Sequence, residues 1–398
     1  MKKSILIFGG GLNQYLLIKT AKDLDYISVV IDPLPDAPGK EIADFFYVVD
    51  GKDYETTKKV ALKHSVSAIV TTQMEKPLRI MAKLAQDLQL QFHSPEVVER
   101  SLNKWLMKQQ FLKNNIPCAN GKLFLDNQGI REKDLNNLSF PLIMKPIDAT
   151  SSQGVYKVEN FNEIKKYENS TRKFSRNNGL IIEEFLDGPE YSIESITYKG
   201  HTTVCQFTEK FITPFPNTVE MGHLQPADLT FEQKGEIKNL VIAAINAIGI
   251  DNSASHTEVK LTKQGAKIVE IGARGGGDFI SSYLILTSTG INMDEAIIKV
   301  ALGESPDLLP KCSEYAFIKY FDLPVGKRVI RINDWAEVFE EKDIVFVNIS
   351  IKPGDIIEKI TESKKRPGFI IVKGETRDKV LSIAEDLTNS ILTKIILD

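Results

Sequence analysis

The stretch of sequence that decides the fold spans residues 256–278 and reads HTEVKLTKQGAKIVEIGARGGGD. Its first part predicts a β-hairpin with residues 263–265 as a three-residue loop, because glycine in the third position suits the left-handed conformation that such loops need. In this register Glu258 lies directly opposite Glu270 on the neighbouring strand, with Cβ atoms roughly 4.5–5.5 Å apart. Like charges placed opposite each other destabilise a sheet, so this pair requires a counter-charge.

Bound divalent metal ions are the counter-charge that the two facing glutamates favour. Carboxylates that bridge metal ions are a standard way to clamp a phosphoryl group during its transfer. The alternative is a hairpin slipped by one residue, with both glutamates in solvent. Ile268 and Val269 make the second strand too apolar for casual exposure, which favours the metal site. His256 and Lys260 are expected on the same face of the hairpin as the glutamates.

A glycine-rich segment, residues 272–278, follows the hairpin directly. It contains Arg274, whose planar guanidinium matches phosphate geometry and could stabilise a γ-phosphate or a developing acyl phosphate. The surrounding glycines would let the backbone approach a ligand closely. The alternative is a structural arginine in a flexible loop. The glutamates nearby in the sequence favour the phosphate ligand over this alternative.

Two lysines upstream are candidates for phosphate binding. Lys145 ends the apolar strand PLIMKP, where a buried lysine without a partner would be costly. The small polar loop DATSSQG at residues 148–154 offers N–H and hydroxyl donors and could close over a triphosphate as a lid. Lys104, at the start of a predicted helix, could add a second positive charge. Taken singly, either lysine is more often a solvated surface residue.

The segment LIIEEFLDGPEYSIE, residues 180–194, predicts a hinge. Two strand-like stretches meet there at a short link, residues 185–189. Such a link between subdomains can offer backbone donors and acceptors to an adenine edge, and carboxylates to ribose hydroxyls. Further along, residues 232–248 predict a helix with one apolar face.

The first hundred residues alternate short apolar strands, at residues 4–8, 27–31 and about 68–70, with helical patterns. This alternation predicts right-handed crossovers and a parallel sheet. Three glycines after the first strand, with Asp32 ending the second, imitate a dinucleotide-binding fingerprint, but Gln14 replaces its third glycine. The loop is interpreted as an anion site at a helix N-terminus or as a tight turn alone. No GxxxxGK[ST] motif is present, so a P-loop is not supported.

The bulk composition limits the class of protein. The 398 residues suggest two or three domains. A formal net charge of -3 disfavours a nucleic-acid partner, and no apolar run approaches the length of a membrane span. Three widely separated cysteines fit a reducing, cytoplasmic compartment. The basic and then apolar N-terminus is interpreted as a buried strand because it lacks a small-residue cleavage site.

These motifs, in this order, resemble the ATP-grasp superfamily over about residues 1–310. The resemblance implies α/β and α+β multidomain architecture, with an ATP-grasp fold, an N-terminal Rossmann-like pre-ATP-grasp domain and a small C-terminal α+β domain. The expected boundaries are 1–100 for the first domain, 101–310 for the ATP-grasp domain with a mobile lid at about 115–185, and 311–398 for the last. The tail is similar to the small C-terminal domain of biotin-carboxylase-like members.

The resemblance also implies roles for individual residues. EEFLDGPE looks like the hinge motif of D-alanine–D-alanine ligases and their relatives. The nucleotide ligands implied in this way are Lys104, Lys145, Ser151, Ser152, Gly154, Val155, Glu183, Glu184, Leu186 and Glu190, with Glu183 and the Leu186 backbone at adenine and Glu190 at ribose. Glu258 and Glu270 match a pair of magnesium ligands, and Arg274 and Lys145 match catalytic cations. The family usually has an asparagine where Gly272 stands, which suggests weaker binding of a second metal ion.

The N-terminal third resembles purine-pathway carboxylate–amine ligases, whereas HTEVK and VEMGHLQPADL resemble L-amino-acid ligases. The first resemblance places Gly11 and Glu75 at the carboxylate substrate. The second places His223 at the acceptor substrate. An ordinary loop histidine is nearly as good an interpretation of His223. Arg274 is also a substrate candidate.

The activity implied is an ATP-dependent ligase that uses Mg²⁺, or alternatively Mn²⁺, to activate a carboxylate as an acyl phosphate and couple it to an amine. The partners expected are a small-molecule carboxylate and amine, with no nucleic acid and no membrane, in a homodimer. Three alternatives remain open: a glycinamide-forming or carbamoyl-phosphate-type ligase, a non-catalytic ATP-binding regulator, and a nicotinamide-dependent oxidoreductase. The missing third glycine and the acidic hairpin both argue against the last.

Overall fold

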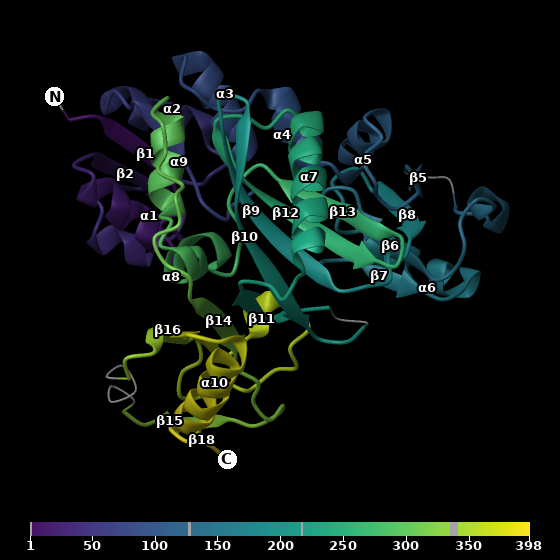
Figure 1. The fold of residues 1–398 in the computed structure, drawn as a ribbon. Coiled ribbons are helices and arrows are strands. Elements are labelled where there is room, and N and C mark those ends of the chain that lie inside the picture. Colours follow the sequence, from purple (N-terminus) through teal and green to yellow (C-terminus); the bar gives the residue numbers. More distant parts are fainter. Residues whose placement is uncertain (1, 126–128, 216–217, 335–340) are drawn as a thin grey trace.

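The computed structural model describes residues 2–125, 129–215, 218–334 and 341–398, arranged as in Figure 1. Its N-terminal region is a parallel sheet in the order β3-β2-β1-β4, which confirms the pattern expected from alternating strands and helices. The elements are β1 (Ser4–Phe8), α1 (Leu12–Asp23), β2 (Ile27–Asp32), a 3₁₀ turn (Pro38–Glu41), β3 (Phe45–Val48), α2 (Tyr54–Lys63), β4 (Ala68–Val70), α3 (Leu78–Leu88), α4 (Pro95–Leu102) and α5 (Lys104–Lys113).

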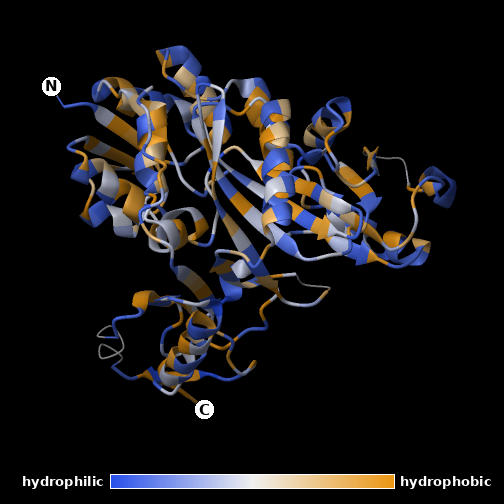
Figure 2. Ribbon diagram, viewed as in Figure 1, coloured by the Kyte–Doolittle hydropathy of each residue, from blue (hydrophilic) through white to orange (hydrophobic). Residues whose placement is uncertain are grey.

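A central antiparallel sheet of eight strands runs in the order β13-β12-β9-β10-β11-β14-β17-β16. Helix α7 covers part of one face, where its buried Ile237 and Val241 share a core with Ile193 and Val259 of the strands. Figure 2 shows hydrophobic residues alternating with hydrophilic ones along this helix. The elements are β9 (Glu190–Tyr198), β10 (His201–Ile212), β11 (Glu220–Gln225), α7 (Phe231–Ile248), β12 (Ser253–Thr262), β13 (Gly265–Gly272), a π-helical turn (Ile280–Leu284), α8 (Ile285–Thr289) and α9 (Met293–Ala301).

A smaller sheet, in the order β5-β8-β6-β7, lies at the right of Figure 1 beside α5 and β13. Its core packs Leu142 and Ile182 against Ile164 of α6. Residues 126–128, within the range expected to form the lid, lie outside the described residues. The elements are β5 (Gly121–Phe124), a 3₁₀ turn (Glu132–Leu135), β6 (Leu142–Pro146), β7 (Tyr156–Val158), α6 (Phe161–Arg172) and β8 (Leu180–Glu184).

The C-terminal region extends the central sheet, because β14 pairs with β11 and β17 pairs with β14. Helix α10 packs Val380 and Ala384 on these strands together with Leu224 of β11. The expected boundary near residue 310 therefore falls between strands of one continuous sheet, and the domain limits stay a prediction. The elements are β14 (Tyr315–Tyr320), β15 (Val329–Ile332), β16 (Ile344–Ile349), a 3₁₀ turn (Ser363–Lys365), β17 (Gly368–Gly374), α10 (Arg377–Leu392) and β18 (Ile395–Leu397).

The acidic hairpin forms from β12 and β13, but its loop differs from the one predicted. Thr262 pairs with Gly265, so the loop has two residues rather than three. A β-bulge next to Glu258 adds one unpaired residue to the second strand, and Glu258 still lies opposite Glu270. The shorter loop and the bulge cancel, because each shifts the register by one residue in opposite directions. The prediction of a three-residue loop was wrong, and the facing of the glutamates is confirmed.

Among the helices that the structure describes, none is long and apolar enough to cross a lipid bilayer.

Candidate functional site

A cavity of about 480 Å³ lies between the small sheet and the central sheet, with contributions from α5 and the segment after β4. Most of the residues expected at a nucleotide and metal site line it. These are Glu75, Lys104, Lys145, Ser151, Ser152, Val155, Glu183, Glu184, Leu186, Glu190, Glu258, Glu270 and Arg274. Gly154, Gly11 and His223 do not line this cavity.

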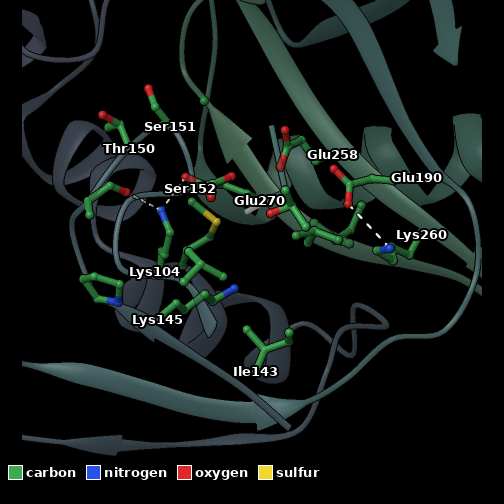
Figure 3. A pocket seen from close by; sticks show the side chains of 18 of the residues that line it. Lys104, Ile143, Lys145, Thr150, Ser151, Ser152, Glu190, Glu258, Lys260 and Glu270 are labelled. Carbon is green, nitrogen blue, oxygen red and sulfur yellow. Dashed lines mark hydrogen bonds and ion pairs between the residues drawn. The ribbon is translucent and has the colours of Figure 1, made fainter. Parts of the chain in front are cut away.

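Two glutamates face each other on one wall of the cavity, and each is paired with a lysine. Glu258 lies 2.7 Å from Lys210 Nζ, and Glu270 lies 2.7 Å from Lys104 Nζ. About a quarter of each glutamate side chain is exposed, 24% and 25%, so both carboxylates remain accessible from the cavity. Figure 3 shows Glu258, Glu270 and Glu190 on the strands, with Lys104 opposite them.

Lys210 of β10 lies among three carboxylates, and the sequence analysis did not single it out. Its Nζ is 2.5 Å from Glu190, 2.7 Å from Glu258 and 3.8 Å from Glu220. Although burial alone would lower the pKa of Lys210, the charges of Glu190 and Glu258 raise it well above its usual value. Burial alone would raise the pKa of Glu258, yet the positive charges of Lys210 and His256 hold it well below its usual value. Lys210 and its three carboxylates together carry an excess of negative charge.

The opposite end of the cavity has the reverse arrangement, with two lysines on one carboxylate. Lys145 Nζ lies 2.5 Å from one oxygen of Glu183, and Lys108 Nζ lies 3.0 Å from the other. All three side chains are less than a tenth exposed. Burial opposes ionisation of both Lys145 and Glu183, but their mutual attraction raises the pKa of Lys145 and lowers that of Glu183. The lysine at the end of the apolar strand is therefore buried and paired.

Apolar side chains border this lysine-rich end. Ile268 of β13 meets Cys118 in an isolated parallel bridge, and both line the cavity. Met107, Phe111 and Ile143 line it as well. A mostly apolar slot with a few donors at its edge is the usual form of a site for a flat organic ring.

The polar loop after β6 borders the cavity with its side chains. Ser151 and Ser152 line the cavity and both have positive φ, 56° and 55°, which is uncommon for residues other than glycine. Gly154, with φ 71°, packs away from the cavity, because a Cβ there would lie 2.7 Å from the Phe174 ring. Lys104 Nζ donates to Ala149 O at 2.9 Å, so the same lysine contacts both the loop and Glu270.

The predicted hinge connects β8 to β9 through residues 185–189. Glu184 accepts hydrogen bonds from Asn120, including one from its backbone N–H at 3.1 Å. Gly188 has φ 142°, and a Cβ there would overlap the carbonyl of Leu261, so only glycine fits. Lys260 reaches the Gly188 carbonyl at 3.1 Å and Glu190 at 3.7 Å. The link is therefore held against β12, the strand that carries Glu258.

Arg274 forms an ion pair with Glu75, which comes from the segment after β4. Burial opposes both charges, but the pairing raises the pKa of Arg274 and lowers that of Glu75. Arg274 also donates to Gly275 O at 2.9 Å. The pair joins the N-terminal region to the end of β13 at the cavity wall.

His256 of β12 lines the cavity two residues before Glu258 and forms an ion pair with Glu194 of β9. Burial alone would lower the pKa of His256, but the charge and hydrogen bond of Glu194 raise it to about 9. The Nε2 atom of His256 lies 3.8 Å from Glu258. His256 and Lys260 thus both border the cavity, as expected from the face of the hairpin.

Gly11 lies instead in a second cavity, of about 370 Å³, between the glycine loop and the C-terminal region. Asp278, which also lines that cavity, binds Arg366 through two hydrogen bonds of 2.7 and 2.8 Å. His223 is 2% exposed and lies 3.2 Å from Asp278. It therefore contacts a residue that lines the second cavity but does not line the cavity itself. Gln73 lines the first cavity and donates a hydrogen bond of 3.2 Å to the backbone oxygen of Asn13, which lines the second cavity.

The donor set at Glu258 and Glu270 suits a hard divalent cation, because both ligands are carboxylates. Within residues 2–125, 129–215, 218–334 and 341–398, no group of three or more histidine, cysteine, aspartate or glutamate side chains could hold a metal ion by itself. A metal ion at these two glutamates would therefore need oxygen atoms from a bound phosphate or from water.

Four charged residues of the site were missed in the sequence: Lys108, Glu194, Lys210 and Glu220. Two had a usable signal. Lys108 follows Lys104 by one helical turn, and Glu194 follows Glu190 by four positions on a strand, which places each pair on one face. The other two, Lys210 and Glu220, reach the site only because β10 and β11 add to the sheet beside β9, which no local pattern specifies.

Comparison with known proteins identifies two families of domain in the chain. Residues 138–282 match an ATP-grasp domain, and residues 322–394 match the L-amino acid ligase C-terminal domain 2. Dapdiamide A synthase of Enterobacter agglomerans is 23% identical over 345 residues, covering 82% of this chain and 79% of that protein. Alanine–anticapsin ligase of Bacillus subtilis is 29% identical over 280 residues, covering 64% of this chain. The chain spans just over half, 58%, of the length of that relative.

The solved structure of an L-amino acid ligase from Bacillus licheniformis matches the fold with a TM-score of 0.83 and 23% identity, covering 98% of this chain and 97% of the other. The expected ATP-grasp architecture is thereby confirmed. The chain contains an ATP-binding domain of the ATP-grasp type, and the two relatives named above are a synthase and a ligase.

Proposed function

We propose that this chain, with its ATP-grasp domain and its L-amino acid ligase C-terminal domain, is an ATP- and Mg²⁺-dependent ligase that couples a carboxylate to an amine. The observation that carries the proposal is the pair of facing glutamates, Glu258 and Glu270, in the same cavity as the buried Lys145. Carboxylates for a metal ion and cations for phosphate oxygens are the parts that phosphoryl transfer requires.

The nucleotide base would occupy the apolar slot beside the two-lysine end. Both oxygens of Glu183 are already paired with lysines, so its carboxylate serves to orient Lys145 rather than to bind the base. The backbone at Leu186 then supplies the contact with the adenine edge. Glu190, at the far end of the hinge, is placed for the ribose hydroxyls.

The triphosphate would extend from the slot toward the glutamates, below the loop that contains Ser151 and Ser152. Mg²⁺ bound at Glu258 and Glu270 would neutralise charge on the transferring phosphoryl group. Lys104 and Lys210 hold these carboxylates in place and would turn toward phosphate oxygens when the metal ion binds. Gly272 leaves water or phosphate to complete the metal coordination.

The chemistry proceeds in two steps. The carboxylate oxygen attacks the γ-phosphorus, and the bond from that phosphorus to the β-phosphate oxygen breaks, which gives an acyl phosphate and ADP. Arg274 and Lys145 stabilise the charge that builds up on the transferring group. The amine then attacks the carbonyl carbon and phosphate leaves. A loop that closes over the site would limit hydrolysis of the acyl phosphate.

The substrates proposed are small amino acids or similar metabolites, because two of the proteins named above are an alanine–anticapsin ligase and an L-amino acid ligase. In this proposal Glu75 and Arg274 bind the carboxylate substrate. Gly11 and His223 contribute through the second cavity, which lies next to the first. The closing loop at about 115–185, the three-domain division, a homodimer and a cytoplasmic location complete the proposal. Light scattering during size-exclusion chromatography tests the homodimer.

The proposal is tested by phosphate release from ATP and Mg²⁺ across a panel of amino acids, small carboxylates and amines, with Glu270→Ala as control. Release that requires a specific carboxylate and amine, and that the variant lacks, supports the ligase. ATP binding without substrate-dependent release favours the second candidate, a nucleotide-binding regulator, for which Gly272 is the motivating departure from the family pattern.

A further inference from the structure

Lys260 of β12 lies between the hinge and the residue proposed for the ribose, and it has no part in the activity proposed above. In the sheet it pairs directly with Glu190, the first residue of β9. Its side chain is 18% exposed and lines the nucleotide cavity. Figure 3 shows Lys260 and Glu190 with their charged ends directed toward each other. The amine of Lys260 is therefore within reach of a ligand in the cavity.

The hinge fixes the position of this amine. Lys260 Nζ donates to the Gly188 carbonyl at 3.1 Å. The next residue, Leu261, binds the hinge as well, because its N–H donates to Pro189 O at 3.0 Å. The hinge approaches β12 so closely that a Cβ at Gly188 would overlap the Leu261 carbonyl. One N–H of Lys260 is thus engaged with the hinge, and the amine keeps at least one more for a ligand whether or not it is protonated.

The carboxylate of Glu190 has one oxygen engaged and one open. Lys210 Nζ donates to Oε1 at 2.5 Å. Oε2 lies 3.7 Å from Lys260 Nζ, which is beyond hydrogen-bond distance. No other donor of the described residues lies closer to Oε2 than Lys260 does. An acceptor, Glu190 Oε2, and a donor, Lys260 Nζ, therefore lie side by side at the cavity without bonding to each other.

A hydroxyl group matches this pair of atoms. Its oxygen can accept a hydrogen bond from Lys260 Nζ, and its proton can be donated to Glu190 Oε2. The separation of 3.7 Å is too long for a bond between the two side chains, but it lets one oxygen beside them contact both. A carboxylate or phosphate oxygen has no proton for Glu190, and an ammonium group has no acceptor for Lys260. The pair thus selects a neutral group that both donates and accepts.

The position of the pair in the cavity indicates which hydroxyl it binds. Leu186, proposed at the adenine edge, precedes Glu190 by four residues along the hinge. Glu258, proposed at the metal ion, precedes Lys260 by two residues and lies on the same face of β12. The group that lies between the base and the metal-bound phosphates of a nucleotide is the sugar. The hydroxyl that fits between Lys260 and Glu190 is therefore one of the ribose.

We propose that Lys260 is a specificity-determining residue for the ribose, and that Lys260 Nζ and Glu190 Oε2 bind one ribose hydroxyl between them. The inference rests on the nucleotide site of the proposed function, in which Glu190 alone is assigned to the ribose. Because Lys260 also holds the Gly188 carbonyl, binding of the sugar is linked to the position of the hinge. A nucleotide that lacks this hydroxyl loses both contacts.

The test compares the binding of ATP, 2′-deoxy-ATP and 3′-deoxy-ATP to the full chain, each with Mg²⁺ and without a carboxylate, by titration calorimetry. We expect the wild type to bind ATP at least about tenfold more tightly than one of the two analogues, as when hydrogen bonds to charged groups are lost. Lys260→Met should bind ATP about tenfold more weakly but that analogue within about threefold of wild type, since the analogue has no contact with Lys260 to lose. Lys263→Met, in the exposed loop of the same hairpin, is the matched control and should bind all three nucleotides as the wild type does.

Other outcomes overturn the inference. Binding of both analogues within about twofold of ATP by the wild type would refute it without any variant. Equal weakening of all three nucleotides in Lys260→Met would assign Lys260 to the hinge alone. Lys260→Gln, with a shorter polar side chain, should show the same loss and replaces Lys260→Met if that variant does not fold.

The inference and the proposed function can fail separately. If the wild type binds no ATP, the nucleotide site of the proposed function fails and the inference fails with it. If the wild type binds ATP but releases no phosphate with any carboxylate and amine of the panel, the ligase is refuted. The comparison of the three nucleotides then still decides the role of Lys260, because it measures binding alone.

Discussion

The two ends of the cavity contain charged clusters of opposite composition. At one end two lysines, Lys108 and Lys145, hold one carboxylate, Glu183, and all three are buried. At the other end one lysine, Lys210, lies among three carboxylates. The first cluster has a surplus of positive charge and suits electron-rich groups such as a base edge and phosphate oxygens. The second has a surplus of negative charge and suits a divalent cation. This difference in charge would orient a nucleotide with a bound metal ion if one binds here as proposed.

The largest loss of activity is expected when a carboxylate is removed from the acidic end. Glu270→Ala should lower substrate-dependent phosphate release by about 10³-fold or more, because metal ions contribute several kcal/mol to phosphoryl transfer. The measurement is steady-state phosphate release at saturating ATP. Glu55→Ala, at an exposed position of α2, is the matched control and should leave the rate unchanged. Activity within tenfold of wild type in Glu270→Ala would remove the metal site from the mechanism.

Substitution at the basic end comes next in size. Lys145→Met should lower kcat/KM for ATP by ~10²- to 10³-fold, because it removes a charge-assisted donor to the nucleotide. Lys108→Met is the matched variant, since it takes a lysine from the same carboxylate without removing the residue assigned to phosphate. We expect only about a tenfold loss there. Equal losses in the two variants would mean that the cluster acts as a unit and that Lys145 has no contact of its own.

The next variant removes Lys210, the lysine that lies among three carboxylates at the acidic end. Lys210→Met leaves Glu190, Glu220 and Glu258 without their shared cation, so we expect tighter binding of divalent metal ions by at least about threefold. The rate should fall by about tenfold, since the carboxylates lose their position. Binding of Mn²⁺, measured by electron paramagnetic resonance, reports the affinity without reference to activity. An unchanged or weaker affinity would contradict the charge surplus described for this wall.

A third kind of carboxylate, one without any cation, gives the smallest expected effect. Asp294 of α9 is 2% exposed, and its Oδ1 has no hydrogen-bond partner among the described residues. Burial raises the pKa of Asp294 to about 7. Because the pKa of the folded state exceeds that of the unfolded state, this group favours folding below about pH 4 and loses that contribution as the pH rises through 7.

Asp294→Asn should therefore raise the melting temperature by a few degrees above about pH 8, and the difference should shrink below pH 7 and vanish as the pH falls below about 4. Thermal unfolding followed by circular dichroism across this range is the measurement. A difference that does not depend on pH would show that the effect comes from packing rather than from the charge.

The sequence predicted those parts of the site that depend on local pattern. The facing of Glu258 and Glu270 follows from strand periodicity together with the position of a glycine, and it survived an error in the loop length because the bulge compensated for it. The parallel order of the N-terminal strands likewise followed from alternation. Lys145 was identified because a charge at the end of an apolar strand is costly without a partner.

What the sequence did not predict depends on which strands become neighbours. Lys210 lies 48 residues from Glu258 along the chain and meets it only because β9 lies between β10 and β12. Its partner Glu220 is placed by β11 in the same way. The sequence contains no repeat or motif that specifies this strand order. The contacts of Lys210 with the carboxylates at the acidic end could therefore be recognised only in the structure.

The continuity of the central sheet has a consequence for dissecting the protein. A chain shortened at the expected boundary near residue 310 would lose β14, and with it the partner of β11. The backbone groups of Glu220 to Gln225 would become an open edge, and Leu224 would lose the apolar cover of Phe317 and Val380. Open apolar edges recruit strands from other molecules. The strands of the last quarter of the chain therefore cover this edge, and a fragment that ends near residue 310 should aggregate.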